Sequence, residues 1–366
     1  MVMMMASYKQ LGKQNWQVVI SVGYNEQGKR QRIKRQGFRT KKEAEIFVAD
    51  TLNKKNRGYI TSHQSNILFK DFILQWFNDY KVNTLGINTK NNYLSRINYH
   101  IIPALGNYKL TEITNIIIQN FYNNLINEKK LSSSSAKKII EILNGCFKYA
   151  KKNKLIYTVP TDIDKLKVEK TKIEYWTKEE IDFFLDKIKD SYLYTPVLIS
   201  VLTGLRVGEL CGLKWNNIDL DNGYIIVNSQ VIYDRSTRHL LLTNILKTST
   251  SYRNISIPNF LIKHLEALKT TNNDFVIKNR NGSMCNPRNI SMEFTKKISQ
   301  YEELPKITFH SLRHTHATLL IFNGENIKVV SDRLGHKDIS VTLNTYTHVM
   351  DDMKRDTAKL LDILFN

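Results

Sequence analysis

Four residues near the end of the sequence carry groups that can bind a phosphate and attack it. His310 and Arg313 lie three residues apart in the motif HSLRH, so a helix would place them on one face. His336 follows a Leu-Gly pair, and Tyr346 comes ten residues later. A tyrosine in a polar turn is usually only a half-buried anchor. Two imidazoles, a guanidinium and a phenol that meet at one point are instead suited to a phosphate group.

Two further residues upstream can take part in the same chemistry. Arg206 follows a turn glycine in TGLRVGEL, and Glu209, three residues on, can brace it from the same helix face. Taken alone, this pair is an ordinary salt bridge. Lys247 lies in the turn between two expected strands, where a lysine is usually solvated but can also deliver a proton to a leaving group.

Metal and disulfide chemistry are not expected. His310 and His314 are one helical turn apart, a spacing that suits zinc, but no Glu or Cys nearby completes such a site. Cys146, Cys211 and Cys285 are far apart in the sequence, with no pair at metal-ligand spacing. We therefore expect a reduced, cytoplasmic protein without a metal or other cofactor.

The charge of the chain favours a polyanionic partner. Its 366 residues include 54 Lys and Arg against 34 Asp and Glu, a formal net charge of +20. A lysine-rich proteome would give the same excess, so charge alone leaves nucleic acid binding open. No run of about eighteen apolar residues is present, and the apolar start is too short for a signal peptide. We expect a protein that is neither exported nor embedded in a membrane.

Residues 1–62 are predicted to form a small three-stranded sheet closed by one helix. Apolar residues alternate over 16–24, and a basic strand over 29–37 returns after a turn. The sequence Thr-Lys-Lys-Glu at 40–43 is a capping box that opens the helix. With 13 basic and 4 acidic residues, the segment has a net charge of +9, concentrated on the hairpin. Such strands can enter a DNA groove, although a solvated basic hairpin remains the simpler alternative.

Residues 66–158 are predicted to be helical. Apolar residues recur at helical spacing in four segments, which indicates a four-helix domain. The second helix is expected to be capped by Asn88 or Thr89, and the third to begin at Thr111. A charged stretch at 160–172 with a proline at its start is interpreted as the boundary to the next domain.

Residues 173–366 are predicted to form a mostly helical domain with one small antiparallel sheet. Another capping box begins at Thr177, and strands are expected over 224–231, 240–246 and 253–257. A helix over 327–333 should end at a left-handed glycine, Gly335.

Six residues form a pattern larger than any single motif: Arg206 in TGLRVGEL, Lys247 before Thr-Ser, His310 and Arg313 in HSLRH, His336 in LGH, and Tyr346 in NTYTHV. This pattern resembles the tyrosine recombinases, specifically the integrases of phages, conjugative transposons and genomic islands. The resemblance covers the whole chain. It implies a multidomain α+β protein with an arm-type DNA-binding domain at 1–62, a SAM-like core-binding domain at 66–158, and a catalytic domain with a C-terminal tail helix at 173–366.

The resemblance also implies a role for each motif residue. Arg206 and Arg313 would stabilise the pentavalent transition state at a phosphodiester, while His310 and His336 would add hydrogen bonds to its oxygens. Tyr346 would attack to give a 3′-phosphotyrosyl bond and a free 5′-hydroxyl, with His310 also available to accept its proton. Lys247 would protonate the leaving oxygen.

The implied partners are double-stranded DNA at core and arm attachment sites and, on synapsed DNA, a homotetramer. Excision factors and host DNA-bending factors are possible accessories, and the apolar tail at 354–366 would pack in cis or on a neighbouring copy. Two alternatives stay open. A type IB topoisomerase-like enzyme would use the same chemistry without exchanging strands, and a catalytically silent DNA-binding regulator would use none of it.

Overall fold

The computed structural model describes residues 6–24, 30–56, 67–167, 174–244, 252–271 and 273–346. Contacts between Cα atoms divide the chain into two compact units, residues 1–169 and 170–366. Within the described residues, no helix is long and apolar enough to span a membrane.

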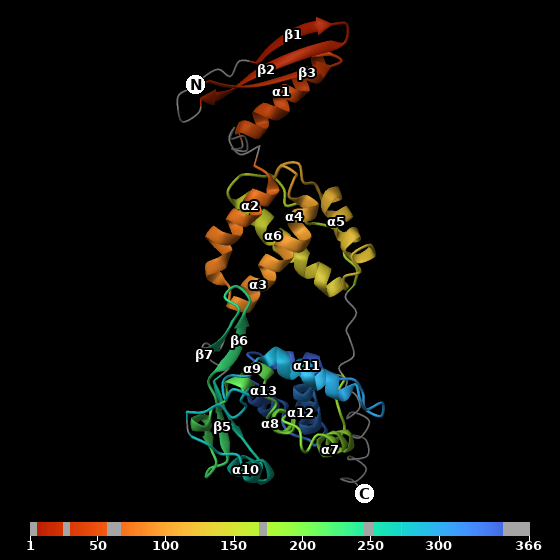
Figure 1. Ribbon diagram of the computed structural model, residues 1–366. Coiled ribbons are helices and arrows are strands. Elements are labelled where there is room, and N and C mark those ends of the chain that lie inside the picture. Colours follow the sequence, from red (N-terminus) through yellow and green to blue (C-terminus); the bar gives the residue numbers. More distant parts are fainter. Residues whose placement is uncertain are drawn as a thin grey trace, which may run out of the picture. The chain divides into compact units, whose positions relative to one another are not determined.

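The N-terminal module is the expected three-stranded sheet with one helix. Its elements are β1 (Ala6–Gly12), β2 (Asn15–Tyr24), β3 (Arg30–Phe38) and α1 (Lys41–Asn56). The strands are antiparallel in chain order, and α1 packs on the sheet (Figure 1). Val18 and Ile20 of β2 are fully buried with Ala44 of α1, because alternate residues of a strand point to the same face. The capping box is present, since Thr40 Oγ1 accepts a hydrogen bond from the Glu43 backbone amide.

The next domain contains four helical segments around one core, as expected. Its elements are α2 (Phe69–Gln75), which continues through η1 (Trp76–Lys81) and η2 (Val82–Thr84); α3 (Ile87–Arg96), which continues through η3 (Ile97–Ile101) and α4 (Ile102–Leu105); α5 (Asn115–Asn127); and α6 (Ser133–Lys152). Phe69 of α2 stacks on Phe147 of α6 with 5.1 Å between ring centroids.

Two helix starts in this domain differ from the sequence predictions. The second segment begins at Ile87 after Gly86, before both predicted capping residues. The third begins at Asn115 rather than Thr111, because the Thr114 side chain caps it by accepting a hydrogen bond from the Ile117 amide. Both differences are small, since several polar residues in each turn can cap a helix.

The first part of the predicted boundary segment, 160–172, is attached to α5. Gln119 exchanges two hydrogen bonds with the backbone of Asp164, at 2.8 and 3.1 Å. The Leu166 amide donates to the Tyr122 hydroxyl at 3.1 Å. Residues up to 166 thus belong structurally with the helical domain, whereas the domain limits as a whole stay predictions.

The second unit combines seven helices and five strands among its described residues. The helices are α7 (Lys178–Lys187), α8 (Tyr194–Thr203), α9 (Val207–Gly212), α10 (Asn259–Glu266), α11 (Pro287–Ile298), α12 (Ser311–Phe322) and α13 (Ile327–Leu334), with a 3-10 turn, η4 (Trp215–Asn217). The strands are β4 (Ile218–Asp219), β5 (Tyr224–Val227), β6 (Gln230–Asp234), β7 (His239–Thr243) and β8 (Arg253–Ser256).

The single sheet predicted for this unit is in fact two. Strands β4, β5 and β8 form one antiparallel sheet, and β6 pairs with β7 in a separate hairpin. The predicted strand over 224–231 breaks at Ser229, whose buried hydroxyl donates to the carbonyl of Gly212 at 3.1 Å. A Cβ at Gly212 would lie 2.9 Å from the Gln230 Cα, so the glycine lets α9 approach β6. These contacts with Gly212 occur where the predicted strand is interrupted, between β5 and β6.

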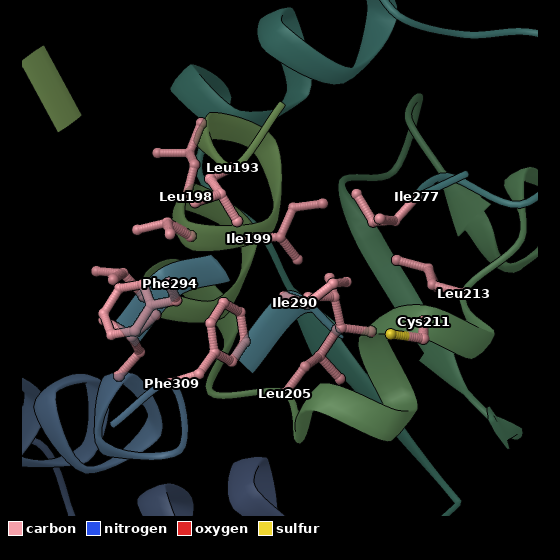
Figure 2. Packing of buried hydrophobic residues seen from close by; sticks show 14 of the residues in the cluster. Leu193, Leu198, Ile199, Leu205, Cys211, Leu213, Ile277, Ile290, Phe294 and Phe309 are labelled. Atoms are coloured by element: carbon pink, nitrogen blue, oxygen red, sulfur yellow. The ribbon is translucent and has the colours of Figure 1, made fainter. Parts of the chain in front are cut away.

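The main core of the second unit fixes the segments that carry the motif residues. Figure 2 shows Leu205 and Phe309 among the packed side chains, together with Phe294 of α11 and Cys211 of α9. Leu205 and Phe309 are 2% and 3% exposed and immediately precede Arg206 and His310. Burial of Leu205 and Phe309 therefore fixes the backbone positions from which the side chains of Arg206 and His310 project.

Candidate active site

Arg313 connects the segments that carry the other motif residues. It lies in the first turn of α12 and is 3% exposed. Its Nη1 donates to the Gly204 carbonyl at 2.8 Å, and its Nη2 donates to the Leu334 carbonyl at 2.6 Å. Gly204 lies two residues before Arg206, and Leu334 lies two residues before His336. One guanidinium thus holds both turns.

Burial of Arg313 also affects its ionisation. Desolvation, followed by the charge of Arg206, lowers the pKa of the Arg313 guanidinium to about 9. The group is still a cation at pH 7. Because Arg313 and Arg206 are two cations close to each other, they favour the binding of an anion at this site.

Arg206 is fixed by Glu209, as the sequence predicted. The Arg206 backbone amide and Nη1 donate to the Glu209 carboxylate at 3.0 and 2.7 Å. Its Nη2 also lies 3.5 Å from the carbonyl of Gly335. About a third of the Arg206 side chain remains exposed, in contrast to Glu209. Arg206 is therefore held in place and still accessible.

Glu209 has a second partner that sequence analysis missed. Arg253, at the start of β8, donates from Nη2 and Nη1 to the two Glu209 oxygens at 2.9 and 3.3 Å, and from Nε to the Arg333 carbonyl at 2.7 Å. Burial opposes the charged form of Glu209, yet Arg253 and Arg206 outweigh it and lower the carboxyl pKa to about 2. The sequence held one signal for this contact: Arg253 is a charged residue at an inward position of a predicted strand.

His336 lies just beyond α13, as predicted. Gly335 ends the helix in the left-handed conformation, with φ 67°. His336 is half-buried, and its Nδ1 lies 2.8 Å from the Thr342 hydroxyl. Desolvation and the nearby Arg313 and Arg206 lower its pKa to about 4, so the ring is neutral at pH 7. A neutral ring held through Nδ1 can present Nε2 as a hydrogen-bond donor.

Tyr346 is buried against helices α12 and α13. It is 1% exposed and belongs to a small cluster with Ala317, Ile321 and Val330. Burial raises the pKa of its phenol, while Arg313 acts in the opposite direction. The hydroxyl lies 2.9 Å from Nδ1 of His314.

His310 is the residue that precedes α12 and is exposed. Its pKa is lowered, first by desolvation of the ring and then by Arg313 and Arg206. Its ring lies 5.1 Å from that of His314, nearly perpendicular to it. Five of the six predicted residues are thus brought together, and Lys247 lies outside the described residues, as does the tail at 354–366.

Comparison with known proteins relates each part of the chain to a known family. The model of the phage integrase family matches residues 174–353, the phage integrase N-terminal SAM-like domain matches 68–126, and the arm DNA-binding domain matches 6–55. A tyrosine recombinase XerC-like protein of Caldanaerobacter subterraneus subsp. tengcongensis is 31% identical over 98% of both chains. The chain belongs to the phage integrase family of tyrosine recombinases. The predicted family and fold class are confirmed.

Other members of the phage integrase family show the same relationship. The ICEBs1 integrase of Bacillus subtilis is 29% identical over 76% of this chain and 79% of its own length. The fold matches that of the Tn1549 transposon integrase in complex with transposon right end DNA, with a TM-score of 0.71 and 22% identity over 81% of this chain and 99% of that one. It also matches a lambda integrase dimer bound to a COC' core site, with a TM-score of 0.61 and 20% identity over 92% and 93%.

The site of this recombinase has the composition required at an anionic centre. Two guanidiniums and the neutral imidazole of His336 supply donors, His310 lies close to both arginines, and a phenol lies within the electrostatic influence of Arg313. Sequence analysis missed Arg253 and Thr342, and it considered His314 only as a zinc ligand. The i, i+4 relationship to His310 was visible for His314, but its contact with Tyr346 depends on packing between α12 and the helical residues 339–346.

Proposed function

We propose that this recombinase integrates and excises a mobile element by cutting and rejoining DNA through a 3′-phosphotyrosyl intermediate. The observation that supports it most directly is the position of Arg313. Its two hydrogen bonds hold the turns before Arg206 and His336, and its charge acts on the phenol of Tyr346. A phosphodiester bound at this centre would meet donors from both arginines before the nucleophile attacks.

The arginines and imidazoles stabilise the transition state in this proposal. The pentavalent phosphorane carries more negative charge than the bound diester, so fixed cationic donors favour it over the ground state. Loss of either Arg206 or Arg313 is expected to cost about 3–4 kcal/mol, roughly 10²–10³ in cleavage rate. His310 and His336 donate to the nonbridging oxygens.

Lys247 completes the proposed reaction by protonating the leaving 5′-oxygen. The phosphotyrosyl bond keeps the energy of the original phosphodiester, so a 5′-hydroxyl of another DNA can attack it in the reverse step. Neither ATP nor a metal ion is needed for these steps.

The N-terminal module is proposed to bind arm-type DNA through the sheet face opposite α1. Val18 and Ile20 face the helix, so the side chains of Val19 and its cross-strand neighbour Lys34 point away from it. By the same register Arg32 lies on this outer face, opposite Ser21. Both cations are exposed and can reach phosphates along a groove.

Exchange between two DNA sites requires several copies of the recombinase, and we propose a homotetramer on synapsed core sites. A solved lambda integrase is a dimer bound to a COC' core site, which agrees with assembly on DNA. The tail at 354–366 is proposed to contact a neighbouring copy. Its deletion should impair assembly more than binding to a single site.

Strand exchange between two labelled duplexes that carry the ends of the element tests this function. Wild-type protein should yield recombinant products. Cleavage and resealing of single duplexes without exchange would instead indicate a topoisomerase-like enzyme. Binding without either reaction would indicate a DNA-binding regulator and contradict the proposal.

A further inference from the structure

We infer that His314 is a catalytic residue of this recombinase, the general base that takes the proton of Tyr346 when the phenol attacks DNA. This inference rests on the proposed nucleophilic role of Tyr346. It assigns the role of proton acceptor to His314. The sequence resemblance suggested His310 for this role.

The first support is contact with the reacting atom. His314 Nδ1 lies 2.9 Å from the Tyr346 hydroxyl, within the range of a strong hydrogen bond. The two ring centroids are 5.9 Å apart with an interplanar angle of 60°, so the imidazole meets the phenol edge-on. A base must be within about 3.2 Å of the proton that it removes, and His314 meets this requirement.

The second support is the fixed position of both partners. His314 lies on α12 directly after the buried Arg313 and one turn before Thr318, which is fully buried. Tyr346 is enclosed by Ala317, Ile321 and Val330. Neither ring depends on an exposed loop for its orientation, so the contact is built into the packing of α12.

The third support is the charge around the imidazole. His314 is surrounded by Arg313 on its own helix, by His310 just before that helix, and by Tyr346 and His336 from the neighbouring segments. Desolvation, followed by His310 and Arg313, lowers its pKa to about 4. The ring is therefore unprotonated at pH 7 and has a lone pair available. An anionic DNA phosphate beside these cations would raise the pKa of the His314 ring toward 7.

The proton balance of the step is as follows. The Tyr346 oxygen forms a bond to phosphorus, the bond from phosphorus to the 5′-oxygen breaks, and the phenolic proton moves to His314 Nδ1. The leaving 5′-oxygen takes its proton from a separate acid, Lys247 in the proposed function. In the rejoining step the imidazolium returns its proton to the phenolate of Tyr346 as that oxygen leaves phosphorus.

A DNA substrate with a bridging 5′-sulfur separates base from acid catalysis, because a thiolate leaves without being protonated. The variants are His314→Asn, which keeps a polar atom near the Nδ1 position, and Lys247→Ala as the matched control. With normal DNA, His314→Asn should form the covalent adduct about 10²–10⁴-fold more slowly than wild type. With sulfur-substituted DNA it should remain slow relative to wild type, whereas Lys247→Ala should recover.

The dependence of the rate on pH gives a second readout that a purely structural role would not change. With the sulfur substrate, the wild-type rate should vary little between about pH 7.5 and 8.5, because His314 is already unprotonated over this range. The rate of His314→Asn should rise about tenfold per pH unit, because hydroxide must then generate the phenolate. His314→Ala, with the same profile and partial recovery by added imidazole, would support the same conclusion.

Three results would overturn the inference. His314→Asn could cleave at the wild-type rate, it could recover with the sulfur substrate, or it could keep the wild-type pH profile. Equal DNA binding and an equal urea midpoint for wild type and variant exclude misfolding as the cause of a slow rate. Absence of any adduct with wild-type protein would instead contradict the proposed function itself, and this inference with it.

Discussion

Arg253 Nη2 lies 2.9 Å from Glu209 Oε2. The other oxygen of this carboxylate, Oε1, forms an ion pair with Arg206 Nη1. Glu209 is 3% exposed and Arg253 is 8% exposed. A buried carboxylate between two guanidiniums is stable only while both charges are present. The accessible Arg206 is therefore held in position through Glu209 by Arg253, which begins β8 more than forty residues later in the sequence.

Glu209→Gln should destabilise the catalytic domain, because it leaves two guanidiniums without their counter-charge. The expected loss in the free energy of unfolding is about 3–5 kcal/mol, measured by urea unfolding. Asp182→Asn is the matched control, since it breaks an exposed ion pair with Lys178 and should cost about 0–1 kcal/mol. Equal effects of the two substitutions would show that the Glu209 network contributes no more than a surface pair.

Gly204→Ala should impair both folding and cleavage. Gly204 has φ 67°, and an added Cβ would lie 2.7 Å from the ring of His316 and 2.9 Å from Leu334. Gly324→Ala is the control, because its φ is 81° but no atom lies within 4 Å of the added Cβ. The control should cost about 1–2 kcal/mol in unfolding free energy from backbone strain alone. Gly204→Ala should cost more, and equal losses would argue against the predicted clash.

The catalytic domain should lose stability as the pH falls below about 6.5. His316 donates from Nδ1 to the Val201 carbonyl and accepts at Nε2 from Arg333, so it is held neutral, and burial lowers its pKa to about 3. Between pH 6.5 and 3 the unfolded chain binds a proton that the folded domain excludes, so acid favours unfolding. His314 and His336, with pKa values of about 4, act in the same direction.

Urea unfolding at several pH values measures this dependence. Each such histidine contributes a slope of about 1.4 kcal/mol per pH unit within its window. His316→Gln should reduce the slope, although it also lowers stability at pH 7.5. A stability that stays constant or rises between pH 6.5 and 5 would contradict the neutral state of these rings.

The outer face of the N-terminal sheet should account for part of the salt dependence of arm-site binding. Lys34→Gln removes a cation from this face and should reduce the slope of log K against log salt concentration by about 0.9. Arg35→Gln is the matched control, because Arg35 lies on the α1 side, 5.3 Å from the centroid of the Phe47 ring. A larger change in slope for Arg35→Gln would place the DNA on the opposite side of the module.

Local sequence signals predicted the parts of this recombinase that local interactions determine. The capping box at Thr177 and the left-handed Gly335 are present because each depends on only a few neighbouring residues. The break at Ser229 depends on a contact with Gly212, and no strand periodicity contains that information. The hydrogen bond between His314 and Tyr346 was missed for the same reason, since it joins two helices through tertiary packing.

Covalent attachment of the protein to DNA tests the central claim most directly. A labelled duplex that carries the element's end and a nick near the cleavage site traps the intermediate, because the short 5′-hydroxyl fragment diffuses away. Denaturing electrophoresis should show a slowly migrating adduct with wild-type protein and none with Tyr346→Phe, although both should bind the DNA equally. An adduct that persists in Tyr346→Phe would contradict the assignment of Tyr346 as the nucleophile.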